Sequence, residues 1–127
     1  MPKQVFATTA APAAIGPYSQ IVKAGNTYYL SGQVGFDPAT GQLREGIDAQ
    51  IEQVFANLSA LCQACGGSFA DAVKMTLYLT DLGNFAKVNE AMAKHVPQPY
   101  PTRVTVGVAS LPRGALFEAD AILYIEK

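Results

Sequence analysis

The fold is decided by the stretch Tyr100-Pro101-Thr102-Arg103-Val104-Thr105-Val106-Gly107-Val108, in which apolar and polar residues alternate as they do along a β-strand. The valines at 104, 106 and 108 form one apolar face. On the other face, Arg103 is followed by a small hydroxyl residue, Thr105, and then by a glycine, which leaves open space beside the guanidinium. Because a guanidinium fork matches a carboxylate bidentately, this face resembles half of a pocket for a small carboxylic acid.

A second alternating segment, residues 115–125, follows the loop signature Leu-Pro-Arg-Gly at 111–114. Its apolar face holds residues 117, 119, 121, 123 and 125, whereas Glu118 and Asp120 lie on the other face. If the two strands pair as a hairpin, the register brings Glu118 near Arg103. The two charges then complete a small-acid pocket, or they form an ordinary surface ion pair that contributes little to stability.

The composition indicates one folded domain, residues 1–127. Half of the residues are hydrophobic and 15% are charged, which excludes disorder. The net charge is −1, the pI is about 5.7, and lysines and arginines are scattered singly, so nothing attracts nucleic acid. No segment approaches the roughly 20 apolar residues that span a bilayer, and the N-terminus lacks the apolar core of a signal peptide. We therefore expect a soluble, cytoplasmic protein without nucleic-acid or membrane partners, and the low charged fraction suggests self-association.

Two helices are expected before residue 100. Apolar residues recur at helical spacing from about Asp48, and Gly66-Gly67 is expected to end this first helix. The second helix is expected to begin at an Asn84 cap and to stop before Pro97. Asn89 falls within the apolar stripe of the second helix, which is unusual for a helix with a purely structural role.

Strands are expected on either side of the first helix. Residues 3–8 favour a short first strand, and residues 20–24 and 27–33 favour a hairpin with a two-residue turn at Gly25-Asn26. Residues 73–80 alternate strictly, with Val73 on the same apolar side as residues 75, 77 and 79. The order of elements predicts an α+β fold in which two helices pack on one face of a mixed sheet of about six strands.

The segment Cys62-Gln63-Ala64-Cys65 matches a C-x-x-C pattern, which is typical of redox or metal sites. However, both thiols lie on the apolar stripe near the C-terminal end of a helix, whereas reactive thiols favour helix N-termini. A structural zinc site needs four ligands, and the chain adds only His95, whose place at a helix end favours a cap or a dipole partner. We therefore interpret the cysteines as core residues and expect no metal site.

Several motifs together resemble the Rid family, also called the YjgF family, of enamine/imine deaminases. In chain order they are Gly16-Pro17-Tyr18-Ser19-Gln20, Ser31-Gly32-Gln33, Asn89, Pro101-x-Arg103, and Leu111-Pro112 followed by Glu118-x-Asp120-Ala121. The resemblance covers essentially the whole chain and is greatest to the RidA type. It implies a chorismate-mutase-like fold and a homotrimer with three equivalent pockets between subunits. It also implies hydrolysis of 2-imino acids and their enamine tautomers, released by pyridoxal-phosphate enzymes, to 2-keto acids and ammonia.

The same resemblance implies roles for individual residues. Arg103 should clamp the substrate carboxylate, Glu118 should hold the attacking water and accept its proton, and Tyr18 should wall the pocket. Main-chain groups at Thr105 should bond the imine and the water. The pocket should be shaped by Ser31, Gly32 and Asn89. Many relatives have cysteine where this chain has Thr105. Hydrolysis that uses the backbone at this position is therefore still expected here, whereas behaviour that depends on a thiol, such as oxidative activation, is not.

No cofactor is expected, because imines hydrolyse readily and orientation with charge placement suffices. Two other functions stay open. The family has also been described as ribonucleases or translation inhibitors, which a basic groove would support and the acidic pI opposes. A non-catalytic trimer that binds small carboxylates or protein partners would need Arg103 but would have little use for Glu118 beside an anionic ligand.

Overall fold

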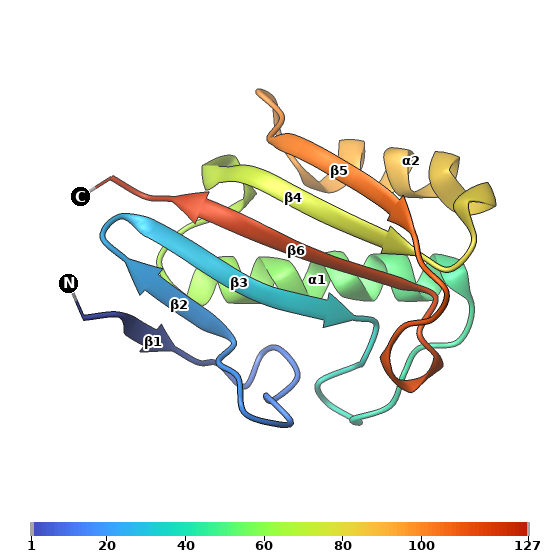
Figure 1. Cartoon of the computed structure of the whole chain (residues 1–127), viewed down its shortest axis with the longest axis horizontal. Coiled ribbons are helices and arrows are strands. Elements are labelled where there is room, and N and C mark those ends of the chain that lie inside the picture. Colours follow the sequence, from blue (N-terminus) through green and yellow to red (C-terminus); the bar gives the residue numbers. More distant parts are fainter. Residues whose placement is uncertain (1, 127) are drawn as a thin grey trace.

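A mixed six-stranded sheet carries two α-helices on one of its faces (Figure 1). The computed structural model describes residues 2–126. Its strands are β1 (Gln4–Phe6), β2 (Ile21–Ala24), β3 (Thr27–Val34), β4 (Ala72–Leu79), β5 (Thr102–Gly107) and β6 (Phe117–Tyr124). The helices are α1 (Ile47–Ala64) and α2 (Phe85–His95), with short 3₁₀ turns η1 (Phe69–Asp71), η2 (Leu82–Asn84) and η3 (Pro112–Gly114). The strand order is β1-β2-β3-β6-β4-β5, antiparallel except for the β4–β5 pair, so the predicted α+β fold is confirmed.

Local signals in the sequence located most of these elements correctly. The β2–β3 hairpin closes between Ala24 and Thr27, and Gly25 takes a positive φ of 62°, as the predicted turn requires. At the end of α1, Gly66 has a φ of 83° and the Gly67 N–H donates to the Cys62 carbonyl at 2.8 Å. This is the expected glycine termination, which satisfies carbonyls that the helix leaves open.

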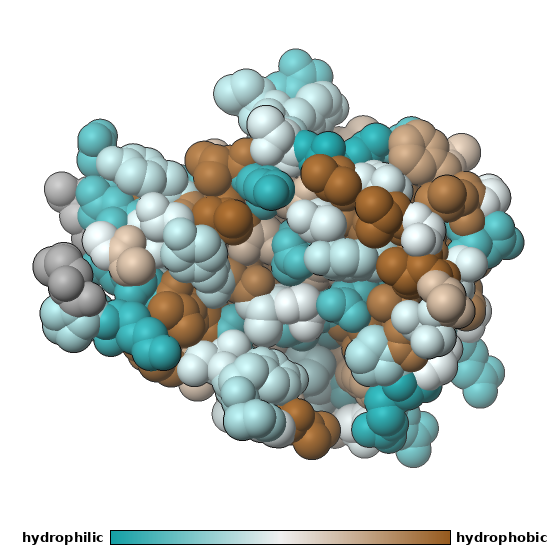
Figure 2. Space-filling model, in the orientation of Figure 1, coloured by the Kyte–Doolittle hydropathy of each residue, from teal (hydrophilic) through white to brown (hydrophobic). Residues whose placement is uncertain are grey.

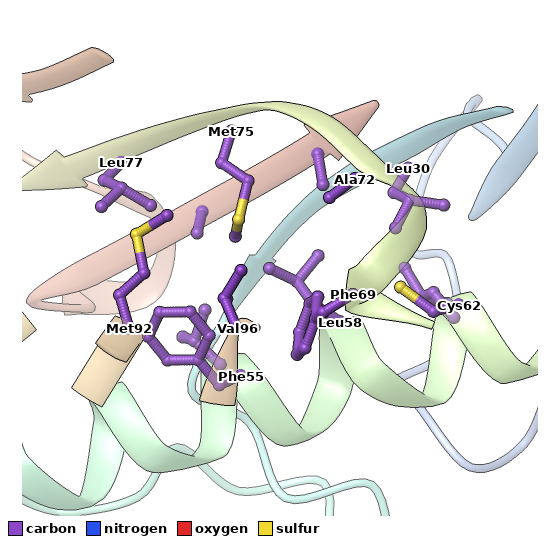
Figure 3. Packing of buried hydrophobic residues seen from close by; sticks show 14 of the residues in the cluster. Leu30, Phe55, Leu58, Cys62, Phe69, Ala72, Met75, Leu77, Met92 and Val96 are labelled. Carbon is purple, nitrogen blue, oxygen red and sulfur yellow. The ribbon is translucent and has the colours of Figure 1, made fainter. Parts of the chain in front are cut away.

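The hydrophobic core lies between the helices and the sheet (Figure 3). The strands contribute alternate residues that are fully buried, among them Met75, Leu77, Leu79, Phe117, Ala119, Ala121 and Leu123. Met92 and Val96 point from α2 and its end toward the sheet, and Phe55 of α1 lies beside them (Figure 3). Cys62 and Cys65 are buried in this core, which confirms their structural interpretation, and burial raises the pKa of the Cys62 thiol to about 12. Within residues 2–126, neither helix is long and apolar enough to cross a membrane.

Two local predictions were wrong in detail. Val73 is exposed because the register of β4 against β6 shifts between Ala72 and Lys74, which removes Val73 from the buried alternation. Asn84 precedes α2 as expected, but its side chain makes no capping hydrogen bond. Asp81 caps the η2 turn instead, where its Oδ1 accepts from the Gly83 N–H at 2.8 Å.

The predicted hairpin between β5 and β6 is wrong. β5 pairs in parallel with β4, and β4 separates it from β6. The physical reason is the polarity of the side chains that each strand turns toward the helices. The helix-facing side of β6 is entirely apolar, so β6 lies at the centre between β3 and β4, whereas β5 presents Arg103 and Thr105 on that side and therefore suits the edge.

No helix of the described residues, 2–126, covers the second face of the sheet, which faces the viewer in Figure 1. The predicted valine face of β5 lies here, because Val104 and Val106 pair with Thr76 and Tyr78 of β4 rather than with its buried residues. The two valines are 45% and 37% exposed, and Tyr29 on β3 is 48% exposed. Figure 2 shows hydrophobic side chains scattered among hydrophilic ones over this face. Within residues 2–126, this sheet face of mixed polarity is therefore left uncovered.

Candidate functional site

A cavity of about 620 Å³ opens where β3 ends and β6 begins. Its walls come from residues 12–18, from the end of β3 with the loop that follows, and from the η3 loop (Figure 1). Three of the predicted site residues line it: Tyr18, Gly32 and Glu118. The strand alternation explains the position of Glu118, because its neighbours Phe117 and Ala119 point into the core and turn it to the opposite face.

Glu118 is a half-buried carboxylate. It lies directly over Gly32, where a Cβ atom would collide with Glu118 Oε2, so the glycine makes room for the carboxylate. Burial raises the pKa of Glu118, and the negative charge of Asp120 raises it further. No donor among residues 2–126 forms a hydrogen bond with the Glu118 carboxylate. The arrangement suits a general base that is open to water or to a ligand.

Asp120 and Tyr78 lie beside Glu118 on the same face of the sheet. The Tyr78 hydroxyl donates to Asp120 Oδ2 at 2.9 Å, and Tyr78 is the direct cross-strand neighbour of Glu118. Burial, followed by the bond to Asp120, raises the pKa of Tyr78 to about 12, so the phenol keeps its proton. Asp120 is therefore engaged with a phenol, while Glu118 remains open to the cavity.

Arg103 lies elsewhere, on the helix-facing side of the edge strand β5. Its Nη1 donates to Asn89 Oδ1 at 2.5 Å, and its guanidinium carbon is 5.2 Å from the centre of the Phe85 ring. The same nitrogen lies 3.9 Å from Met92 Sδ. The hydrogen bond from Arg103 accounts for the polar Asn89 within the apolar stripe of α2, because the Asn89 amide oxygen holds the arginine in place.

Thr105 follows Arg103 on this side of β5. Its Oγ1 is buried and has no hydrogen-bond partner within residues 2–126. The space that Gly107 was expected to leave open is filled, since the Leu82 side chain would lie 3.1 Å from a Cβ added there. Leu82 thus occupies the space at Gly107, and the buried Thr105 hydroxyl is left without a partner among residues 2–126.

The predicted site residues therefore form two groups within one chain. Tyr18, Gly32 and Glu118 line the cavity, and Ser31, whose Oγ accepts from Gln33 Nε2 at 3.2 Å, precedes Gly32 in an irregular part of β3. The second group comprises Arg103, Asn89 and Thr105. The expectation that Glu118 lies near Arg103 across a hairpin is wrong for the single chain, because β4 lies between their strands and their side chains point to opposite faces.

Three buried amides bond backbone groups in the cavity walls or next to them, and the sequence did not predict this role for any of the three. Asn57 of α1 donates to the carbonyls of Val34 and Phe36, at 3.2 and 2.9 Å. Gln50, also on α1, donates to the Arg44 carbonyl at 3.0 Å and accepts from the Leu116 N–H at 2.8 Å.

Gln20 bonds backbone groups of the N-terminal segment that forms another wall of the cavity. It donates to the Pro12 carbonyl at 2.7 Å and to the Thr8 carbonyl at 3.2 Å, and it accepts from the Thr8 N–H at 2.8 Å. A signal for the helical pair was present in the sequence, since Gln50 and Asn57 are seven residues apart on the apolar face of α1. Buried amides in such a stripe indicate backbone groups that need partners.

The cavity also contains a cation that the sequence reasoning treated only as part of a loop. Arg113, in η3, lines the cavity with its guanidinium carbon 5.0 Å from the centre of the Phe36 ring. The contact between Phe36 and Arg113 could not be predicted from periodicity or spacing, because the two residues are far apart along the chain.

A second hollow, of about 490 Å³, lies between α1 and α2 and is lined mainly by charged side chains. Exposed ion pairs join the helices there, with Lys87 3.2 Å from Asp48 and Lys94 2.9 Å from Glu52. His95, the last residue of α2, lies 3.1 Å from Glu52. Across residues 2–126, no three side chains of the His, Cys, Asp or Glu type are grouped so that they could hold a metal ion.

Known proteins resemble this chain over nearly its whole length. The family model described as Endoribonuclease L-PSP matches residues 8–125. The 2-iminobutanoate/2-iminopropanoate deaminase of Mus musculus is 44% identical over 121 residues, which are 94% of this chain and 90% of that protein. The crystal structure of RidA from the Antarctic bacterium Psychrobacter sp. PAMC 21119 is 55% identical, covers 96% of this chain and 99% of its own, and superimposes with a TM-score of 0.94. The crystal structure of E. coli TdcF with bound serine is 37% identical, covers 97% of this chain and 99% of its own, and has a TM-score of 0.90.

These similarities agree with the sequence motifs and with the observed fold. The family model spans well over half of the chain, and the RidA structure shares both its strand arrangement and more than half of its residues. The chain therefore belongs to the Rid (YjgF) family, whose matching model is described as Endoribonuclease L-PSP.

Proposed function

We propose that this protein is a reactive-intermediate deaminase that hydrolyses 2-imino acids to 2-keto acids and ammonia. Relatives named 2-iminobutanoate/2-iminopropanoate deaminase support the reaction, and the serine bound to TdcF supports a small ligand with a carboxylate. The observation that carries the proposal is the Glu118 carboxylate, which lines the cavity, has a pKa raised by burial, and accepts no hydrogen bond from residues 2–126. A carboxylate in this state is suited to take a proton from water.

The proposed chemistry needs only residues of the chain. Glu118 accepts a proton from a water molecule as its oxygen adds to the C=N carbon of the substrate. The proton returns to the nitrogen and gives a carbinolamine. Glu118 then takes the proton of the new hydroxyl group and passes it to the same nitrogen, so that the C–N bond breaks and ammonia leaves as the C=O bond of the keto acid forms. Arg103 binds the substrate carboxylate, and its bond to Asn89 sets the direction of the guanidinium. Tyr18 walls the cavity, and Thr105 supplies hydrogen bonds beside Arg103.

We further propose that the complete site forms between subunits of a homotrimer. In one chain, Glu118 and Arg103 face opposite sides of the sheet, so a carboxylate clamp can reach the base only from a neighbouring copy. The uncovered sheet face, with its exposed Val104, Val106 and Tyr29, gives such copies an apolar surface to cover. A Val106→Glu variant should lose the trimer mass in light scattering. A matched charge on the outside of α2, Ala86→Glu, should retain it, and a wild type that is monomeric at micromolar concentration would contradict the assembly.

The activity is tested by keto-acid formation from 2-iminobutanoate, which a threonine dehydratase generates in situ. The wild type should accelerate its hydrolysis above the spontaneous rate, and Arg103→Ala should not. Glu118→Gln distinguishes an enzyme from a non-catalytic binder, because it should lower turnover by about 100- to 10,000-fold and keep or improve the binding of a keto acid. If the wild type leaves the spontaneous rate unchanged with both 2-iminobutanoate and 2-iminopropanoate, the deaminase proposal fails.

A ribonuclease is not favoured, although the description of the family model names one. The pI of about 5.7 argues against a surface that attracts phosphate backbones. The cytoplasm remains the compartment that the sequence predicts.

A further inference from the structure

Arg113 has the geometry of a ligand-binding residue at the cavity. Its guanidinium lies over the Phe36 ring, 5.0 Å from the ring centre, and both side chains line the same space as Glu118. A cation–π contact occupies none of the five N–H donors of a guanidinium with an oxygen acceptor, so these donors remain for a ligand. Within residues 2–126, no carboxylate lies within ion-pair distance of Arg113 and no acceptor takes a hydrogen bond from it.

The backbone at this position is also unusual. Arg113 has φ 59° and ψ 23°, and it is the one residue other than glycine with a positive φ in the described part of the chain. A side chain in the left-handed region costs about 1 kcal/mol or more. The conformation brings a long cation over Phe36 at a position where glycine or asparagine would fit the backbone better.

In the single chain, before a neighbouring copy adds its Arg103, the cavity is larger than the proposed substrates require. A volume of about 620 Å³ is in the range that holds drug-sized ligands, whereas 2-iminobutanoate has only seven heavy atoms. Arg113 is the sole cation among the residues that line it, beside the acidic Glu118 and Asp37. Asp37 is already engaged, since its Oδ1 accepts from the Ala39 N–H at 2.8 Å. The remaining space therefore has one positive group that can attract a second acidic group of a ligand.

We propose that Arg113 forms a subsite for a distal carboxylate, so that the protein accepts 2-imino acids with an acidic side chain in preference to those with a short apolar one. The inference rests on the proposed deaminase function and adds a substrate class to it. Arg103 of a neighbouring subunit holds the carboxylate next to the imine, and Arg113 receives the carboxylate at the far end, two to three carbons away. The class of reaction that supplies such a substrate is the two-electron oxidation of the amine of an acidic amino acid to its imine by a flavin- or nicotinamide-dependent enzyme.

Binding of stable keto acids tests the subsite without catalysis. Isothermal titration calorimetry compares 2-oxoglutarate, which has a distal carboxylate, with 2-oxobutanoate, which has none. The wild type should bind 2-oxoglutarate about tenfold more tightly, because a charged hydrogen bond is gained. Arg113→Asn, which keeps a residue tolerant of positive φ, should reduce this ratio to about twofold or less, and Arg113→Lys should retain part of it. Arg44→Asn removes an equal charge outside the cavity lining and should leave the ratio unchanged.

The hydrolysis assay then separates the two proposals. The ratio of kcat/KM for 2-iminoglutarate over 2-iminobutanoate should fall about tenfold in Arg113→Asn. Acceleration of 2-iminobutanoate hydrolysis without any binding preference for 2-oxoglutarate, or with a preference that persists in Arg113→Asn, overturns the subsite alone. A wild type that binds neither keto acid and accelerates neither hydrolysis overturns the subsite and the deaminase together.

Discussion

A Gly32→Ala substitution tests the site most directly, because the structure shows what the added methyl group would meet. The new Cβ would collide with Glu118 Oε2 and would lie 3.1 Å from Cδ and 3.5 Å from Cγ of the same side chain. Carbon atoms in contact prefer about 3.5–4.0 Å, so the carboxylate has to move by on the order of 1 Å. A displacement of this size at a reacting group costs up to about 100-fold in rate. We therefore expect kcat/KM to fall about 10- to 100-fold.

The fold should tolerate this change. The atoms that collide belong to the end of a half-buried, flexible side chain rather than to backbone, so the carboxylate can rotate away, and we expect less than about 1 kcal/mol of lost stability. The assay is keto-acid formation from 2-iminobutanoate, with urea unfolding as the control for stability. A double-mutant cycle with Glu118→Gln locates the effect, because Gly32→Ala should cause no further loss once the base is gone. Full activity in Gly32→Ala, or equal losses in both backgrounds, would refute the role given to Glu118.

Three further results are expected. Asn57→Ala should lower the free energy of unfolding in urea by about 2–4 kcal/mol, because two backbone carbonyls lose their donor; Asn84→Ala, which removes no capping bond, should cost less than about 0.5 kcal/mol. Asp120→Asn should lower the pKa of Glu118, since a neighbouring negative charge is removed, and should move the acid limb of the pH profile of kcat/KM to lower pH; an unmoved limb would contradict the assignment of the base. Cys62 should resist the thiol reagent DTNB in the native protein at pH 8 and react only after denaturation, because its thiol is buried with a pKa of about 12; rapid native labelling would contradict the core assignment.

Local features of the fold were predictable, and the pairing of distant strands was not. Both helices and the β2–β3 hairpin follow from periodicity and from glycines that lie close along the chain. The position of β5 depends instead on competition between strands for the centre of the sheet, and the loop before β6 gives no hint that β4 will intervene. Alternation alone therefore identified β5 and β6 as strands but paired them wrongly.

The candidate site was predictable in the same limited sense. The residues came from the motifs, and the structure gathers Tyr18, Gly32 and Glu118 at one cavity. The separation of Arg103 from Glu118 could not be predicted from spacing, because it depends on which face of the sheet each strand presents to the helices. Arg113 was missed for a similar reason, since its contact with a ring more than 70 residues earlier leaves no periodic trace.

The amides of Gln20, Gln50 and Asn57 have a consequence for how this protein can diverge. Their hydrogen bonds to the cavity walls end on carbonyl oxygens and N–H groups, which almost every amino acid supplies. The path of each wall is thus set from the core, independently of the side chains that the wall displays. Substitutions in the loops can therefore change what the cavity recognises while the backbone keeps its course, so new ligand preferences can arise, in nature or by directed evolution, without any rebuilding of the interior.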